Sequence, residues 1–526
     1  MKISHPRFAI GFPVLLYGVS NLVNLDKLTR WFRDGEGVDV LALSAYLLAG
    51  ACAFVAVFAL LAHRRTTKPV AVLLTLLSAV ATYFIAKYDV AIDSSMLRNA
   101  LHTDGVEVGQ LLSLQMVPYA GLALVACALI IVKLEIHFRD SFGYLRSSAA
   151  IVGVALATAL TLLYLNFHAI HRAGNVSNKY IVYSLVPVNV ISSSISVASD
   201  TLKRFVRSYR KEPEISAAVA TPGDLVVVLA IGEASRRKSF SLYGYQRRDT
   251  NPALRRIDGL HLLDGVAAKG STLYALPEIL EKDGIKLTSV VSRSGVPTVC
   301  YVNYTLYDNC SAVGEVRVEN CGHGGKCYDE DVIPLLAADV GKYSAGYRFI
   351  VLHLGGGSHG PTFSKRHPPE FLKFQPTCDD ADVVNRCTPD QLYNSYDNTI
   401  LYVDHVLSEI IRTLDASGAP YVFIYLSDHG ESLLEDGFLF HGTPPGIPLP
   451  EMQAQIPLIV KSSVPLSVVP RLEYRQPEVF DTVLDLFSIV SPDLDRSGSF
   501  LDRRTESALV EVAGDMGPAV QDKASR

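Results

Sequence analysis

The chain has 526 residues, of which 49% are hydrophobic, and its formal net charge is −5. A mean hydropathy of +0.23 is higher than that of an ordinary soluble protein, and the length is too great for one ordinary domain. The sequence contains no long basic tract, and its net charge is negative. Nucleic acid is therefore excluded as a partner.

Five apolar segments precede residue 170, and each approaches the roughly 20 residues that cross a bilayer as a helix. They cover residues 8–24, 39–62, 69–87, 111–132 and 149–167. Any one of them alone could be a buried core helix. Five such runs with short polar connections predict instead a transmembrane domain of five helices over residues 1–170.

Positive charges predict the orientation of these spans. Arg64 and Arg65 lie between spans two and three, and Lys133, Arg139 and Arg146 lie between spans four and five. Such residues gather on the cytoplasmic side of a membrane, so an odd number of spans places the rest of the chain outside the cytoplasm.

The cysteines agree with this orientation. Six of the eight follow the last span, which suits an oxidising compartment. Among the fifteen connectivities that six cysteines allow, we expect neighbours to pair: Cys300 with Cys310, Cys321 with Cys327, and Cys378 with Cys387.

Two segments of mixed polarity, residues 91–112 and 178–209, are expected to lie on the outer face of the membrane. Two roles are open for these segments: a structural spacer, or a site that helps to hold a lipid substrate. The second lies within an expected interfacial helix and basic linker, residues 171–220.

Apolar strands alternate with helices in the next part of the chain, which predicts a doubly wound α/β domain over residues 221–502 and a polar tail over 503–526. A helix is expected over residues 399–414. The expected strands are 225–231, 286–291, 348–354, 421–426 and 456–460.

Acidic and imidazole side chains follow two of these strands. Glu233 comes just after Leu225–Ile231, and Asp428 and His429 come just after Tyr421–Leu426, with His441 further on. Parallel strands bring their carboxyl ends to one edge of a sheet, and these groups are ligands that zinc prefers. A solvated turn, or an acid placed at the start of a helix, is the alternative for each residue alone.

A hydroxyl and a glycine-rich loop add to this pattern. Ser271 and Thr272 precede a short helix, where a hydroxyl can act as a nucleophile or simply as an N-cap, and spacing does not choose between them. His353 and His359 flank a run of three glycines whose amides can surround a phosphate. For His353, a hydrogen-bonded core histidine is the alternative.

Together, these motifs resemble the alkaline phosphatase/sulfatase superfamily, and within it the bacterial phosphoethanolamine transferases that include lipid A-modifying, colistin-resistance enzymes. The resemblance covers nearly the whole chain. Its motifs are Gly232–Arg236, Ser358–Pro361, Tyr396–Thr399, and Ser427–Ser432 with His441-Gly442. It implies a sulfatase-like α/β domain in the periplasm, attached to five helices in the bacterial inner membrane.

The resemblance also implies roles for single residues. Thr272 would be the nucleophile, and one zinc ion, or two, would be bound. The implied zinc ligands are Glu233, Thr272, Asp428 and His429. The residues implied to bind the substrate phosphate or a second zinc are His359, His441, His353 and Glu431. The family's substrate-binding lysine is missing from this region, as are several family cysteines, and Arg293 is expected to bind substrate in place of the lysine.

The implied reaction moves phosphoethanolamine from phosphatidylethanolamine onto Thr272 and then onto lipid A or another envelope glycolipid, by a monomeric enzyme. An amine added to lipid A phosphates would weaken the binding of cationic peptides such as polymyxin. Two alternatives stay open. One is a phosphoglycerol transferase of the lipoteichoic acid synthase type, and the other is a catalytically silent membrane sensor.

Overall fold

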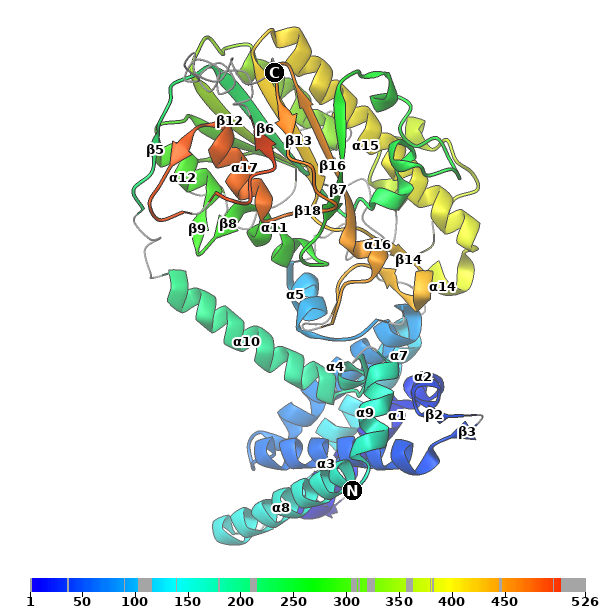
Figure 1. Cartoon of the computed structure of the whole chain (residues 1–526). Coiled ribbons are helices and arrows are strands. Elements are labelled where there is room, and N and C mark those ends of the chain that lie inside the picture. Colours follow the sequence, from blue (N-terminus) through cyan, green and yellow to red (C-terminus); the bar gives the residue numbers. More distant parts are fainter. Residues whose placement is uncertain are drawn as a thin grey trace, which may run out of the picture. The chain divides into compact units, whose positions relative to one another are not determined.

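The structure is a computed structural model of the whole chain, and it contains two compact units (Figure 1). The N-terminal unit comprises Met1–Tyr209 with Ala381–Arg386 and Thr443–Pro448, and the C-terminal unit comprises the rest. The structure describes all residues except 1, 36, 89, 103–115, 139, 178–179, 209–214, 304–309, 311–312, 319–326, 356–362, 379, 381–382, 444–446, 495 and 503–526. The expected polar tail lies outside the described residues.

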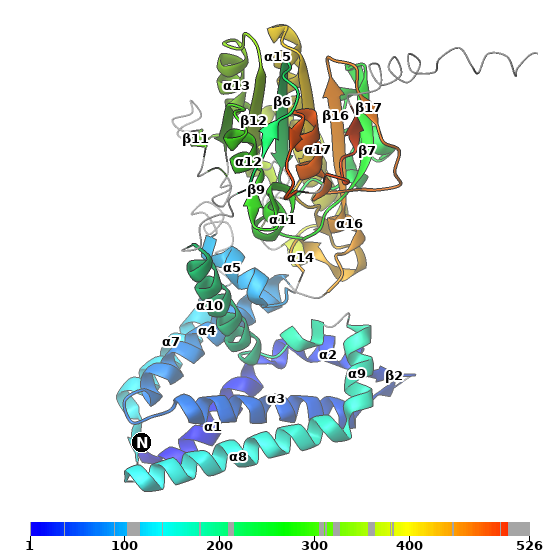
Figure 2. The ribbon, with the colours of Figure 1, turned by 60° about the vertical axis from the view of Figure 1, so that its left-hand side comes forward.

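Five helices of the N-terminal unit are long and apolar enough to cross a membrane, which confirms the expected number of spans. They are His5–Trp31 (α1, η1 and α2), Val40–Leu61 (α3), Thr67–Tyr88 (α4), Met116–Lys133 (α7 and η2) and Ser141–Leu165 (α8). Helices α3 and α8 lie side by side (Figures 1 and 2). Large aliphatic side chains such as Leu41 and Leu160 are exposed on them, as expected for a surface that faces lipid.

Shorter helices occupy the two segments expected at the membrane surface. α5 spans Ser94–His102 and α10 spans Val188–Ser208, and an ion pair between Arg98 and Asp200 joins them. The other short elements of this unit are β1 (Lys2–Ser4), β2 (Arg33–Asp34), β3 (Gly37–Val38), β4 (Glu135–His137), α9 (Phe167–Val176), η3 (Tyr180–Tyr183) and α14 (Val383–Arg386).

A mixed sheet of eight strands forms the core of the C-terminal unit. In spatial order the strands are β11 (Glu315–Arg317), β10 (Thr298–Val302), β12 (Tyr347–His353), β6 (Leu225–Gly232), β13 (Tyr421–Ser427), β16 (Gln455–Ser462), β7 (Leu260–Val266) and β18 (Tyr474–Arg475). The first five strands in this order are parallel, whereas β16 runs antiparallel to both of its neighbours. Every residue of β6 and β13 is buried, as in a sheet covered on both faces.

Helices cover both faces of this sheet. α11 (Thr272–Leu280), α12 (Leu287–Arg293) and α17 (Glu478–Leu486) pack on one face, where alternate residues of β6 such as Val227 and Leu229 meet them in one apolar cluster. α15 (Pro389–Ser417) and α13 (Ile333–Val340) lie on the other face (Figure 2). The unit also contains α16 (Glu451–Ala454) and the strand pairs β5 (Ala218–Val219) with β19 (Ile489–Val490), β8 (Glu281–Lys282) with β9 (Ile285–Lys286), β14 (Ser432–Leu433) with β15 (Leu439–Phe440), and β17 (Ser467–Val468) with β20 (Leu501–Asp502).

The expected strand over residues 286–291 is wrong. A tight turn at Asp283 and Gly284, both with positive φ, closes the small β8–β9 hairpin, and the chain then forms helix α12. Most of α12 is buried, so its apolar run has no polar face to reveal a helical period. The neighbour of β12 on the side away from β6 is β10, and the sequence-based prediction missed this strand together with β11, β7 and β18 of the same sheet.

Two of the three expected disulfides are confirmed. Cys300 is bonded to Cys310 and Cys378 to Cys387, whereas Cys321 of the third expected pair lies outside the described residues.

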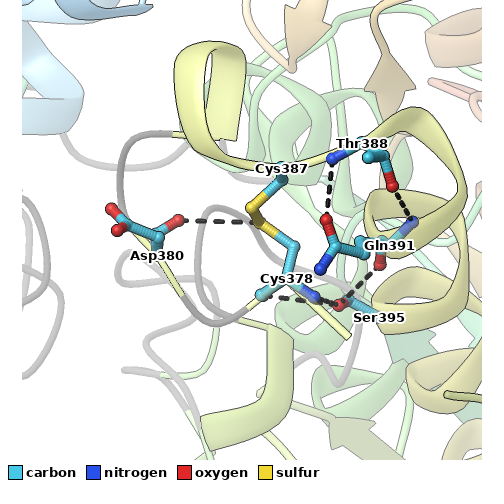
Figure 3. The surroundings of a disulfide bond; sticks show 6 residues. All are labelled: Cys378, Asp380, Cys387, Thr388, Gln391 and Ser395. Carbon is cyan, nitrogen blue, oxygen red and sulfur yellow. Dashed lines mark hydrogen bonds between the residues drawn. A yellow bond between two sulfur atoms is a disulfide. The ribbon is translucent and has the colours of Figure 1, made fainter. Parts of the chain in front are cut away.

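The disulfide between Cys378 and Cys387 lies at the start of α15 (Figure 3). Thr388 Oγ1 caps this helix by accepting the Gln391 N–H at 3.3 Å, and Gln391 Oε1 accepts the Thr388 N–H at 2.8 Å. Ser395 Oγ accepts the Cys378 N–H at 2.7 Å. These contacts fix the first turns of α15 against the preceding chain.

Candidate active site

The polar residues expected at the strand ends meet at one edge of the sheet. β6 and β13 are adjacent and parallel, with Leu426 opposite Ile231 and Ser427 opposite Gly232. Glu233 and Asp428, which follow these strands, are therefore neighbours, and both are buried. This is the edge at which open α/β sheets place their reactive groups.

Four side chains converge there. Thr272 Oγ1 donates a hydrogen bond to Glu233 Oε2 at 2.9 Å and lies 3.4 Å from His429 Nε2. His429 Nε2 in turn lies 3.4 Å from Glu233 Oε1 and 3.4 Å from Asp428 Oδ2. The expected zinc ligands thus form one buried cluster.

The structure brings Thr272, and not Ser271, to this cluster. Thr272 is the first residue of α11, whereas Ser271 is its N-cap in an extended conformation. Ser271 Oγ is buried and has no hydrogen-bond partner in the part of the chain that the structure describes. The start of a helix also favours negative charge on a nearby oxygen.

A second pair of residues adjoins the cluster. His441 Nδ1 lies 2.7 Å from Glu431 Oε2, and the ring centroids of His441 and His429 are 4.5 Å apart. Ligand atoms of Glu233, His429 and His441 all lie within 4.8 Å of one another, a spacing that suits one metal ion. The resemblance implied that His441 binds the substrate phosphate or a second zinc ion, and this spacing puts it within reach of the same ion as Glu233 and His429.

The electrostatics of the cluster fit a cation. Burial and the neighbouring Glu233 carboxylate raise the pKa of Asp428. Burial opposes a charge on the His429 ring, but the carboxylates of Asp428 and Glu233 outweigh it and raise its pKa. Asp428 Oδ2 is buried and has no hydrogen-bond partner among the described residues. A divalent cation would relieve the repulsion between the carboxylates and satisfy this oxygen.

Gln476 supports the cluster from outside it, and sequence reasoning missed this residue. Its Nε2 donates to the carbonyl oxygens of Ser427, at 3.1 Å, and Asp428. Its Oε1 accepts the Ala268 N–H at 2.9 Å. Gln476 therefore ties the end of β13 to the segment that leads to Thr272. Its partners are main-chain atoms far away in the sequence, so no motif marks it.

Known proteins resemble the chain in both units. The family model described as Phosphoethanolamine transferase EptA/EptB matches residues 51–202, and the Sulfatase model matches residues 269–489. Phosphoethanolamine transferase EptA of Salmonella typhimurium is 31% identical over 464 residues, which are 79% of this chain and 81% of that protein. The chain belongs to the phosphoethanolamine transferase family.

Two further relatives cover almost all of this transferase. Phosphatidylethanolamine transferase Mcr-1 of Escherichia coli is 25% identical over 537 residues, 93% of this chain and 96% of that protein. The structure of the integral membrane protein lipooligosaccharide phosphoethanolamine transferase A from Neisseria meningitidis matches with a TM-score of 0.80 and 25% identity, over 95% of this chain and 97% of that chain. The expected membrane helices, sulfatase-like domain and enzyme class are thereby confirmed.

Three other residues expected at the site of this phosphoethanolamine transferase are not part of the cluster described above. His353 is buried at the end of β12, next to the end of β6, and its carbonyl oxygen accepts the Asn303 N–H at 3.0 Å. Arg293 is exposed at the end of α12. His359 lies outside the described residues. The roles expected for these residues stay predictions.

Proposed function

We propose that the protein transfers phosphoethanolamine from phosphatidylethanolamine to an envelope glycolipid, with lipid A phosphate as the acceptor. The observation that carries this proposal is the buried Thr272 hydroxyl, 2.9 Å from Glu233 Oε2 and 3.4 Å from His429 Nε2. The names of two relatives support the substrates, because one is a phosphatidylethanolamine transferase and the other acts on lipooligosaccharide.

Glu233, Thr272, Asp428 and His429 would together hold one zinc ion. Zinc bound there would stabilise negative charge on the Thr272 oxygen and on the oxygens of the phosphate under attack. Glu431 and His441, paired at 2.7 Å, would bind the substrate phosphate or a second zinc ion. The resemblance implies the same role for His359 and His353.

The chain's own residues suggest two displacement steps. In the first, Thr272 Oγ1 attacks phosphorus, and the bond from phosphorus to the diacylglycerol oxygen breaks. Glu233 Oε2 lies within hydrogen-bond distance of the Thr272 hydroxyl and can accept its proton, and the departing diacylglycerol oxygen takes up a proton to become a hydroxyl. In the second step, an acceptor oxygen attacks the phosphorus held on Thr272, the bond from phosphorus to Thr272 Oγ1 breaks, and Oγ1 takes up a proton to re-form the hydroxyl.

We propose that the C-terminal unit lies in the periplasm and that the spans lie in the bacterial inner membrane. We also propose that the protein is a monomer. The basic residues between the spans support this orientation. The two disulfides of the C-terminal unit also support it, because disulfides persist in oxidising compartments.

The test uses the full chain in detergent with phosphatidylethanolamine that carries a fluorescent label on an acyl chain. We expect labelled diacylglycerol to form in the wild type, to cease when zinc is chelated, and to return when zinc is restored. Thr272→Ala should lower the rate by about 10³-fold or more, because the nucleophile is lost. Thr272→Ser, which keeps a hydroxyl, is the matched control and should retain part of the activity.

Three results would contradict the proposal. Diacylglycerol release that is unchanged in Thr272→Ala would exclude Thr272 as the nucleophile. A zinc-loaded wild type that releases no diacylglycerol would favour the silent sensor. Purified lipid A added to the reaction should gain phosphoethanolamine, and release of the group only to water would point to a hydrolase.

A further inference from the structure

The hydroxyl of Tyr396 bridges the loop that carries Glu233. It donates a hydrogen bond to the Ala234 carbonyl at 2.7 Å and accepts one from the Arg236 N–H at 2.9 Å. Tyr396 is fully buried in α15, on the other face of the sheet from α11 and Thr272. A single side chain therefore satisfies two main-chain groups on either side of Ser235.

The backbone of this loop is unusual. Ala234 has φ of 53°, a left-handed conformation that residues with a Cβ rarely adopt. Its N–H donates to Asp428 Oδ1 at 3.0 Å, so this conformation links Glu233 to the neighbouring carboxylate. A strained conformation of this kind persists only where its surroundings hold it in place.

The helix that presents Tyr396 is itself firmly anchored. Asp397, the next residue, accepts hydrogen bonds from Tyr245 at 2.9 Å and Arg247 at 2.8 Å. Asn398 accepts the N–H of Phe374 at 2.8 Å and donates to its carbonyl oxygen at 2.9 Å. The nearby disulfide and the hydrogen bonds drawn in Figure 3 fix the first turns of α15. The Tyr396 hydroxyl thus has a fixed position.

We propose that Tyr396 is a positioning residue for the metal site: its hydroxyl holds Ala234 in the left-handed conformation and thereby aims Glu233 at the cluster. This inference rests on the proposed function, in which Glu233 is a zinc ligand. It gives a role to the Tyr396–Thr399 motif. Residues that orient metal ligands typically change metal affinity about 10- to 100-fold when they are mutated.

The experiment compares Tyr396→Phe with Tyr402→Phe in the full chain. Tyr402 lies on the same helix, is equally buried, and accepts the Glu330 N–H at 3.2 Å. Each variant therefore loses one buried hydroxyl, but only Tyr396→Phe affects the Glu233 loop. Zinc affinity is measured by competition with a chelator, and the absorption spectrum of the cobalt-substituted protein reports the ligand geometry.

We expect zinc to bind Tyr396→Phe about 10- to 100-fold more weakly than the wild type, with a changed cobalt spectrum. The zinc affinity of Tyr402→Phe should stay within about twofold of the wild-type value, with an unchanged cobalt spectrum, because this substitution leaves the Tyr396 contacts with the Glu233 loop intact. Equal losses in both variants would overturn the inference, because they would reflect general destabilisation. Wild-type affinity with an unchanged spectrum in Tyr396→Phe would also overturn it.

A milder replacement covers the case in which Tyr396→Phe does not fold. Tyr396 replaced by 3,5-difluorotyrosine keeps the ring and the hydroxyl but makes the oxygen a weaker acceptor for the Arg236 N–H. The same change makes the hydroxyl a stronger donor to the Ala234 carbonyl, so the two hydrogen bonds change in opposite directions. We expect zinc affinity to change about two- to fivefold, and no change would overturn the inference. A wild type that binds no zinc would overturn the proposed function as well, whereas unaffected variants of a zinc-binding wild type overturn only this inference.

Discussion

The hydroxyl of Thr272 lies 2.9 Å from Glu233 Oε2 and 3.4 Å from His429 Nε2, although 39 and 157 positions separate these residues in the chain. The fold produces this proximity, because β6 and β13 end side by side and α11 begins at the same edge of the sheet. A hydroxyl held in this way has a fixed orientation before substrate arrives, which favours nucleophilic attack.

Zinc affinity should increase with pH. Burial and the Glu233 carboxylate raise the pKa of Asp428 in the metal-free protein, so zinc must displace a proton from this buried pair. A proton competes best at low pH, and affinity should therefore fall as pH falls through the raised pKa. Each proton released changes affinity by about tenfold per pH unit. Chelator competition between about pH 6 and pH 8 measures this slope, and a flat profile would contradict the prediction.

Arg236→Ala should destabilise the C-terminal unit by about 3–5 kcal/mol, because it leaves the Glu435 carboxylate without its buried cationic partner. Arg236 Nη1 lies 2.6 Å from Glu435 Oε1, with side chains 3% and 18% exposed. Lys238→Ala is the matched control. Lys238 Nζ is also 2.6 Å from a carboxylate, that of Glu451, but these side chains are 42% and 56% exposed. The control should cost less than about 1 kcal/mol. The free energy of unfolding of each variant is measured on the full chain in detergent. An equal decrease in both variants would contradict the prediction.

Asp404 should make the protein less stable as pH rises from about 4 to 6. Its carboxylate accepts the N–H groups of Ala253 and Leu254 at 2.8 and 2.9 Å, and burial raises its pKa from 3.8 to about 6. The folded state thus binds the proton more tightly than the unfolded state does. The contribution of Asp404 to the free energy of unfolding is greatest below the pKa that this group has in the unfolded state. It is lost as pH rises through the pKa of the folded state.

The difference between these pKa values corresponds to about 3 kcal/mol. Asp404→Asn cannot titrate, so we expect the stability of the wild type relative to this variant to fall by that amount between about pH 4 and pH 7. Denaturant unfolding at a series of pH values measures the difference. Parallel profiles for the two proteins would show that Asp404 does not titrate in this range.

Replacing Cys378 and Cys387 together with serine should cost about 2–3 kcal/mol, because the disulfide closes a short loop and so restricts the unfolded chain. The two cysteines are 9 positions apart, and both precede Pro389, the first residue of α15. Cys52→Ser, which removes a cysteine that forms no disulfide, controls for loss of a sulfur atom. Unfolding under non-reducing conditions measures the cost. Detection of a free thiol at Cys378 in the wild type would refute the assignment.

The four central strands of the main sheet (β12, β6, β13 and β16) and its reactive edge could be predicted because their pattern is local. Buried strands such as 225–231 and 421–426 are continuous apolar runs that end in polar residues. Residues 286–291 show where this reasoning stops. A helix that is buried on most of its surface has the same kind of apolar run as a buried strand. Here the chain forms such a helix directly after the β8–β9 hairpin.

The residues around the site also divide into those that the sequence predicts and those that it does not. Glu233, Asp428 and His429 could be predicted, since each follows an apolar strand and bears a side chain that binds metals. Gln476 could not, because it contacts main-chain atoms 48 and 49 positions away. Such contacts depend on the folded backbone and leave no spacing pattern in the sequence.

The decisive measurement is peptide mass spectrometry of the purified full chain after incubation with phosphatidylethanolamine and zinc. We expect a phosphoethanolamine group on the peptide that contains Thr272, located on Thr272 itself and absent from Thr272→Ala. The adduct should disappear when lipid A is added, because the acceptor takes up the group. Diacylglycerol release without any adduct on Thr272, or an adduct on Ser271 instead, would contradict the proposed nucleophile.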